Sequence, residues 1–325
     1  MGRSAVPVAL LAVSLLGGPL QSETDIHHNP TGEATNRGRA PDTSTVVDEG
    51  SAGRFNITPA GLYLGAGELR EPLGLAVDAR GFVYVADAMT GKVFRYGEDG
   101  GSLEFEQPPR TASLYPIDLA AYGTFIYVLD YVENRIVRYD TKGAYLDILL
   151  SFNELERVHP ASLTAGEGGR IVTTDIEHHT VTVWTPLLDV ELTVGEYGWS
   201  AGKFDRPTKA ALLPDDRIAV VDAGNRRVQL FTPAGGFERL LTLPDGEQFR
   251  SPRSVTVDSY GFIYVTDSGE GRVVVFTAGG EFVLNIETYG DAEIAPASLT
   301  VGWNDRLYIA DLVSRSILVY DIHYP

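Results

Sequence analysis

A six-fold internal repeat is the feature that most constrains the fold of this chain. Six prolines open similar segments, with successive spacings of 44, 44, 47, 45 and 44 residues: Pro72, Pro116, Pro160, Pro207, Pro252 and Pro296. An aspartate follows each proline after 15 residues, or after 14 in the second segment: Asp87, Asp130, Asp175, Asp222, Asp267 and Asp311. Several short strands repeated at this period are typical of a β-propeller, in which each repeat forms one small sheet.

The segment from Pro72 to Tyr96 shows how one repeat is built. It predicts three short strands, at residues 73–77, 82–86 and 92–96, separated by turns at 78–81 and 87–91. The third strand ends on an aromatic residue in every repeat: Tyr96, Tyr139, Trp184, Phe231, Phe276 and Tyr320. A unit of this size cannot bury both faces by itself, so the repeats must pack on one another. Six aligned repeats predict an all-β, six-bladed propeller.

Composition and charge narrow the possible functions. The 325 residues are 44% hydrophobic, which is ample for a core, and the formal net charge is −18. That charge argues against nucleic acid as a partner, since phosphate neutralisation requires a basic surface. It also argues against an anionic membrane surface. The chain has no cysteine, so disulfides, thiolate nucleophiles and cysteine metal sites are excluded.

The first 53 residues differ from the repeats. Residues 1–22 contain Arg3, an apolar run at residues 5–16 and small residues after it, which is the pattern of a secretory signal peptide. Residues 23–53 are rich in polar residues, glycine and proline and predict a disordered linker. The expected localisation is therefore secreted or periplasmic. The propeller is expected to span residues 54–325 and to be monomeric.

The last repeat ends just after its third strand and lacks a fourth. Thr58-Pro-Ala-Gly61, followed by Leu62–Leu64, echoes the turn at Thr232–Gly235 and the strand that follows it. We therefore expect Leu62–Leu64 to supply the outermost strand of the sixth blade, which joins the two ends of the domain and removes an open edge.

The repeats resemble NHL repeats, in which G-x-F-x-x-P precedes a small strand and then Y-V-x-D. The matching segments are Gly202–Pro207, Gly246–Pro252, Tyr84–Asp87, Tyr264–Asp267 and Tyr308–Asp311. The resemblance covers residues 54–325 and implies six blades of four strands each. The family includes both protein-binding scaffolds and a few enzymes, so the resemblance leaves the function open.

The six aspartates that close the second strands suggest a structural role. A carboxylate at this place can accept hydrogen bonds from the following turn. It can also pair with a basic residue five positions later, as Lys92, Arg135, Arg227 and Arg272 would allow.

Candidate ligand-binding residues flank the prolines, where loops on one face surround the central channel of a propeller. They are Glu71, Asp118, His159, Arg206, Lys209 and Arg253. Asp118 and Lys209 stand where most repeats have a small residue, and a charge near a narrow channel requires a partner or water. Two interpretations remain open. The charges neutralise one another, or the basic side binds a carboxylate-bearing ligand or a peptide terminus.

Three histidines of the third repeat are candidate metal ligands: His159, His178 and His179. Their spacing does not establish a site, and no cofactor is indicated. The family's peptidyl-hydroxyglycine lyases carry metal-binding histidines on different blades, a pattern that this chain does not reproduce. The expected function is an exported protein- or peptide-binding scaffold that uses its top-face loops. The alternatives are a metal-assisted lyase or hydrolase at the channel mouth and a structural component of the envelope or extracellular space.

Overall fold

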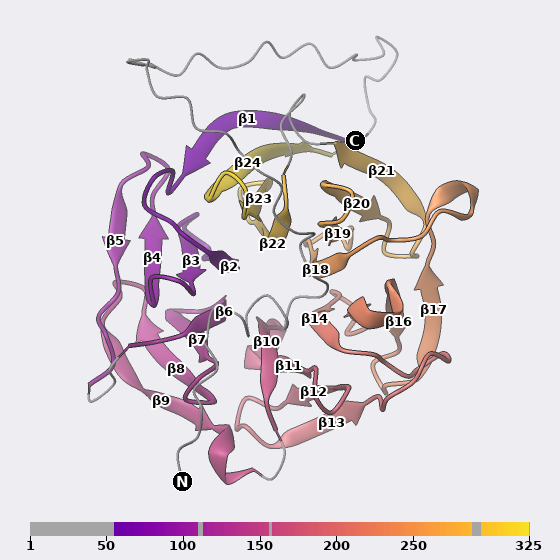
Figure 1. Cartoon of the computed structure of the whole chain (residues 1–325), viewed down its shortest axis with the longest axis horizontal. Helices are drawn as coiled ribbons and strands as arrows, with labels where there is room; N and C mark the ends of the chain where they lie inside the picture. Colours follow the sequence, from indigo (N-terminus) through magenta and orange to yellow (C-terminus); the bar gives the residue numbers. More distant parts are fainter. Residues whose placement is uncertain (1–54, 110–112, 156–157, 288–293, 325) are drawn as a thin grey trace, which may run out of the picture.

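The computed structural model describes residues 55–109, 113–155, 158–287 and 294–324. Within these ranges the strands form six four-stranded antiparallel sheets. Figure 1 shows the sheets as blades of a ring, with the first strand of each blade nearest the centre. The predicted all-β, six-bladed propeller is confirmed. The predicted signal peptide and linker lie outside the described residues. No helix in the described ranges is long and apolar enough to cross a membrane.

The blades follow the sequence repeats. Blade 1 contains β2 (Pro72–Val77), β3 (Val83–Asp87), β4 (Lys92–Tyr96) and β5 (Ser102–Glu104). Blade 2 contains β6 (Pro116–Tyr122), β7 (Phe125–Asp130), β8 (Arg135–Asp140) and β9 (Tyr145–Ser151). Blade 3 contains β10 (Pro160–Ala165), β11 (Ile171–Asp175), β12 (Thr180–Trp184) and β13 (Val190–Val194).

The second half of the ring continues in the same way. Blade 4 contains β14 (Pro207–Leu212), β15 (Ile218–Asp222), β16 (Arg227–Phe231) and β17 (Phe237–Leu241). Blade 5 contains β18 (Pro252–Val257), β19 (Ile263–Asp267), β20 (Arg272–Phe276) and β21 (Phe282–Glu287). Blade 6 contains β22 (Pro296–Gly302), β23 (Arg306–Asp311), β24 (Ser316–His323) and β1 (Asn56–Leu64). In the described part of the chain, four short 3-10 turns lie between strands: η1 (Phe152–Glu154), η2 (Glu167–Gly169), η3 (Ala223–Asn225) and η4 (Pro244–Gly246).

The strand register places the repeated prolines and aspartates at one end of every blade. In blade 1, Pro72 pairs with Asp87, and Asp87 pairs with Lys92. The opening proline pairs with the closing aspartate in the other five blades as well. We call this end of the ring the top face. It carries the starts of the innermost strands and the turns between second and third strands.

The core lies between adjacent blades. Between blades 1 and 2, Tyr84 and Val93 of one sheet belong to the same buried cluster as Leu119 and Val137 of the next. Each fully buried side chain of this kind contributes about 1.5–3 kcal/mol relative to exposure. The Tyr84 hydroxyl donates to Asp78 Oδ2 at 2.9 Å, so its one polar group is satisfied. Each blade therefore depends on its neighbours to bury its apolar side chains.

The two ends of the domain meet in blade 6. Strand β1 pairs antiparallel with β24, from Asn56 opposite His323 to Leu64 opposite Ile317. Figure 1 shows this indigo strand outside the yellow one. The predicted closure by residues 62–64 is thus present, and the closing strand is longer than predicted.

The six closing aspartates have structural roles, but not only those expected from the sequence. Each accepts a backbone N–H from a residue one or two positions before its own proline. Arg135 and Arg227 pair with Asp130 and Asp222 as expected, at 3.0 and 2.7 Å. Lys92 instead pairs with Glu104 at 2.7 Å. These carboxylates tie the incoming loop to the second strand and hold the top face in place.

Candidate functional site

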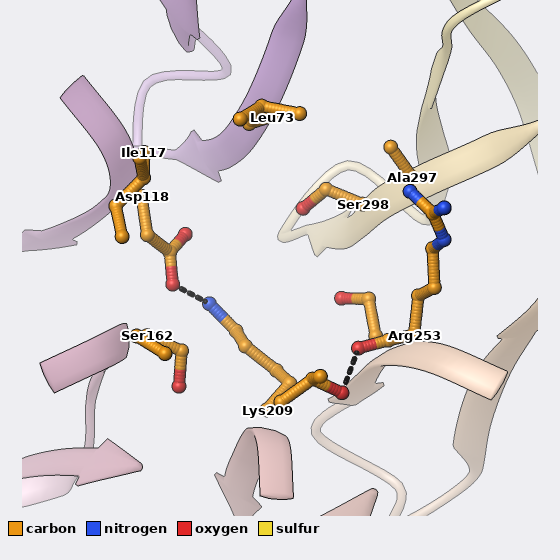
Figure 2. A pocket seen from close by; sticks show the side chains of 11 residues that line it. Leu73, Ile117, Asp118, Ser162, Lys209, Arg253, Ala297 and Ser298 are labelled. Carbon is orange, nitrogen blue, oxygen red and sulfur yellow. Dashed lines mark hydrogen bonds and ion pairs between the residues drawn. The ribbon is translucent and has the colours of Figure 1, made fainter. Parts of the chain in front are cut away.

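A central pocket opens where the innermost strands begin. Its eleven lining residues all lie one or two positions after the six prolines: Leu73, Ile117, Asp118, Ala161, Ser162, Thr208, Lys209, Arg253, Ser254, Ala297 and Ser298. The cavity has a volume of about 50 Å³, which is room for a few water molecules or one small chemical group. We refer to it as the central pocket (Figure 2).

Asp118 and Lys209 form an ion pair on one side of the central pocket. Lys209 Nζ donates to Asp118 Oδ2 at 2.5 Å and to the carbonyl oxygen of Leu163 at 2.8 Å. The same Asp118 carboxylate accepts the backbone N–H groups of Leu163 and Leu119, at 2.7 and 2.9 Å. Burial raises the pKa of Asp118, and the Lys209 charge and these two N–H groups oppose that shift. The two charges neutralise each other, in line with the first of the two interpretations left open by the sequence.

A glycine makes room for this aspartate. A Cβ on Gly74 would lie 2.6 Å from the Cα of Asp118, a distance shorter than any ordinary contact. Blade 1 therefore has glycine at the position that carries a side chain in the other blades, because the backbone of blade 2 occupies that space.

Arg253 is the second cation of the central pocket and has a different environment. Its Nε is buried and has no hydrogen-bond partner in the described part of the chain. In Figure 2 the guanidinium lies beside Ala297, across the pocket from Asp118. The neighbouring Ser254 Oγ is also buried without a partner among the described residues. By contrast, Thr208 Oγ1 donates to the carbonyl oxygen of Arg253 at 2.8 Å.

Glu71 acts on Arg253 through its charge. Burial lowers the pKa of Arg253, and the negative charge of Glu71 partly offsets that effect. Burial and the neighbouring Asp87 raise the pKa of Glu71, while Arg253 lowers it. No ion pair between Glu71 and Arg253 occurs in the described structure, so the guanidinium has an electrostatic neighbour without a direct contact partner.

The other predicted site residues lie outside the central pocket. The exposed His159 donates its backbone N–H to Asp175 at 2.9 Å. The Arg206 backbone N–H donates to His179 Nδ1 at 3.0 Å, and the Arg206 side chain is 42% exposed. His178 Nδ1 lies 2.9 Å from the Asp175 carboxylate. In the described ranges, no group of three histidine, aspartate or glutamate side chains is placed to hold a metal ion. A metal at these histidines stays a prediction.

The opposite end of the ring is hollow as well. A cavity of about 280 Å³ is lined by later residues of the innermost strands, including Leu163 and Val301, and also by Lys209. Lys209 thus borders both cavities.

Exposed apolar side chains occupy the turn tips of three consecutive blades on the top face. Two residues after the closing aspartate, blades 6, 1 and 2 carry Val313, Met89 and Val132, which are 58, 61 and 56% exposed. The corresponding residues of blades 3, 4 and 5 are Glu177, Gly224 and Gly269. We call the first three residues the apolar arc. The sequence interpretation did not single it out, although aligning the turns shows it.

Aromatic residues extend the exposed surface next to this face. Tyr197 and Trp199 lie in the loop before β14 and are 62 and 78% exposed. The loop is anchored to blade 4, because Asn225 Nδ2 donates to the carbonyl oxygen of Gly198 at 2.9 Å. Both side chains therefore lie exposed on the surface.

Fold and site together define a six-bladed β-propeller with a small charged pocket on its axis. Residues 249–276, which include the opening of blade 5 and its central-pocket residues Arg253 and Ser254, match the family model of the NHL repeat. The chain is therefore a six-bladed propeller that carries an NHL repeat.

Known proteins share parts of this architecture. The human E3 ubiquitin-protein ligase TRIM32 is 29% identical over 102 residues, which is 28% of this chain and 16% of that protein; the mouse protein is 28% identical over the same length. This chain therefore matches about one sixth of the length of these curated relatives.

Solved structures resemble the whole ring. A streptogramin B lyase has a TM-score of 0.63 and 14% identity, and the match covers 83% of this chain and 98% of the lyase. The gluconolactonase XC5397 of Xanthomonas campestris has a TM-score of 0.61 and 19% identity, with 83% and 95% covered. At these identities the resemblance shows the fold alone.

Proposed function

We propose that this chain is an exported scaffold that binds a protein or peptide through the top face of its propeller. The apolar arc is the observation that carries the proposal. Val313, Met89 and Val132 are large apolar side chains held out to solvent at equivalent turns of consecutive blades. Apolar and aromatic residues of this kind form the centres of protein interfaces.

The rigidity of the turns supports this function. The aspartate that precedes each tip is buried and hydrogen-bonded to backbone, so the tips are held by the sheet rather than by the partner. A surface ordered before binding loses little conformational entropy when a partner docks. The similarity to TRIM32 extends over 102 residues, which are only 16% of that ligase. A segment that forms a small part of a larger protein is consistent with a binding module.

The binding proposal is tested with peptide libraries displayed with free C termini and selected against the purified propeller. Selected peptides should lose affinity for a Met89→Glu/Val132→Glu/Val313→Glu variant. The matched control is Leu187→Glu, because Leu187 is 83% exposed but lies in the turn between β12 and β13, away from the top face. Selection of no specific peptide, or equal loss in variant and control, would contradict the proposal.

Export is supported by the apolar run at residues 5–16 that follows Arg3 and precedes small residues. Residues 1–22 fused to a leaderless reporter should carry it out of the cytoplasm, and the released reporter should lack most of these residues by mass spectrometry. A reporter retained in the cytoplasm would contradict export.

A further inference from the structure

Two consecutive residues of β18 leave buried polar atoms unsatisfied in the same pocket. Arg253 Nε and Ser254 Oγ have no partner in the described ranges, and both residues line the central pocket. Buried polar groups are usually hydrogen-bonded, and a buried charge is especially costly to leave unpaired. Two such atoms on consecutive residues that line one pocket indicate a place that a ligand completes.

The carboxylate among the lining residues of the pocket is already engaged. Asp118 Oδ2 accepts from Lys209 Nζ and the Leu163 N–H, and Asp118 Oδ1 accepts from the Leu119 N–H. Ser162 Oγ pairs with Thr174 Oγ1 at 2.8 Å. The Asp118–Lys209 charges cancel, so Arg253 gives the central pocket one positive charge, which the nearby Glu71 offsets only in part and without a direct ion pair in the described ranges. The missing partner is therefore an anion.

Size and lining specify what kind of anion fits. The cavity of about 50 Å³ holds a group of a few non-hydrogen atoms. Leu73, Ile117, Ala161 and Ala297 give it apolar walls beside the charge. A single cation with apolar surroundings suits a monoanion that carries carbon, whereas a phosphate dianion would bring a second charge without a partner. Guanidinium pairs with planar carboxylates through two parallel hydrogen bonds.

We propose that the central pocket is a carboxylate-binding site in which the Arg253 guanidinium receives the carboxylate of a ligand. The carboxylate belongs either to the C terminus of a bound peptide or to a small free carboxylic acid. The peptide source rests on the proposed function, because the apolar arc would hold the peptide around the pocket. The free-acid source does not depend on it.

The first experiment uses propionate as the probe and the full chain as the protein. Propionate should raise the melting temperature more than sodium chloride of equal ionic strength, because a ligand that binds the folded state stabilises it. The Arg253→Gln variant should bind propionate about tenfold more weakly or worse, as measured by ligand-observed NMR, because it loses a charge-assisted pair. Arg206→Gln is the matched control, since it removes a top-face arginine that lies outside the central pocket, and it should bind propionate normally.

Stability without ligand gives a second readout. If Arg253 serves to bind a ligand and not to stabilise the fold, Arg253→Met should melt at the same temperature as the native protein or higher, because the substitution removes an unpaired buried charge. It should also lose the response to propionate. A clearly lower melting temperature would show that Arg253 has a structural partner and would overturn the proposal.

A comparison of free-acid and C-terminally amidated forms of selected peptides separates the two sources. If the amide binds more weakly than the free acid to the native protein, and the two forms bind equally to Arg253→Gln, the ligand is a peptide terminus. If propionate binding requires Arg253 but amidation has no effect on peptide binding, the ligand is a free acid. If neither propionate nor peptide binding depends on Arg253, the carboxylate site is refuted. The binding scaffold would still stand if peptides depend on the apolar arc. If no peptide is selected but propionate binding requires Arg253, the scaffold fails and the site remains.

Discussion

Replacing Lys209 by methionine should destabilise the propeller strongly, because it leaves a buried carboxylate without its cation. Methionine keeps most of the side-chain volume but donates nothing to Asp118 or to the Leu163 carbonyl oxygen. Removing one partner of a buried ion pair typically costs about 3–5 kcal/mol. Asp118 keeps its two backbone N–H donors, so we expect the lower end, about 3 kcal/mol.

The double variant Asp118→Asn/Lys209→Met separates this charge effect from packing. With both charges removed, only neutral hydrogen bonds are lost, each worth about 1 kcal/mol. The double variant should therefore be more stable than Lys209→Met alone. The free energy of unfolding is measured in urea for the native protein, the two single variants and the double variant, with equal denaturant slopes as a check on the unfolded state.

The effect of pH gives an independent signature. Burial raises the pKa of Asp118, and Lys209 opposes that shift in the native protein. Without Lys209, the folded-state pKa rises further above the unfolded value, so the destabilisation is present at neutral pH and shrinks as the pH falls through the raised value. Two results would refute the interpretation of a buried, mutually dependent pair. One is a double variant whose loss in free energy of unfolding equals the sum of the two single-variant losses, and the other is a loss in Lys209→Met that does not change with pH.

Other parts of the fold make separate predictions. Deleting residues 54–66 should lower the melting temperature of the whole propeller, and an unchanged value would mean that β24 does not require β1. Gly74→Ala should cost about 1–3 kcal/mol in urea titrations, because the new Cβ would lie 2.6 Å from the Asp118 Cα; native stability would show that the two backbones separate without cost. Burial raises the pKa of Glu71 in the folded protein above its usual 4.5. The native protein should therefore lose stability as the pH rises from about 4.5 through the folded-state pKa of Glu71. Glu71→Gln should lack that part of the loss, and parallel pH profiles of the two proteins would contradict it.

The sequence predicted the ring because its signals are local and repeated. Pro72 and Asp87 lie 15 residues apart on neighbouring strands, and the same spacing recurs around the chain. The closing strand was also predictable, since the last repeat lacks a fourth strand and residues 58–64 echo a repeat. Its full length was not, because the pairing of Asn56 with His323 depends on contacts between distant parts of the chain.

The pocket was predictable in composition but not in pairing. Asp118 and Lys209 stood out as charges in place of small residues, yet their partnership spans 91 residues and exists only after the ring closes. Arg253 was named with His159 and Arg206 because all three flank a proline. The structure separates them: the residue after the proline faces the pocket, whereas the residue before it belongs to the incoming loop. Ser254 is one of the small residues at the position of Asp118 and Lys209, and its buried hydroxyl, unpaired within the described ranges, required coordinates to recognise.

Blade 6 has a consequence for how the chain becomes a ring. Its outer strand comes from the first described residues and its other three strands from the last, with Asn56 opposite His323. During synthesis, β1 therefore leaves the ribosome before the other strands of the propeller. It cannot pair with β24 until the final repeat has also been made. Blades 1 to 5 can stack as an open arc in the meantime, and the first and last blades acquire their shared interface in a single late step. Any domain attached to either end of the propeller would leave from this same seam, so two attached partners would be neighbours on the outside of the ring.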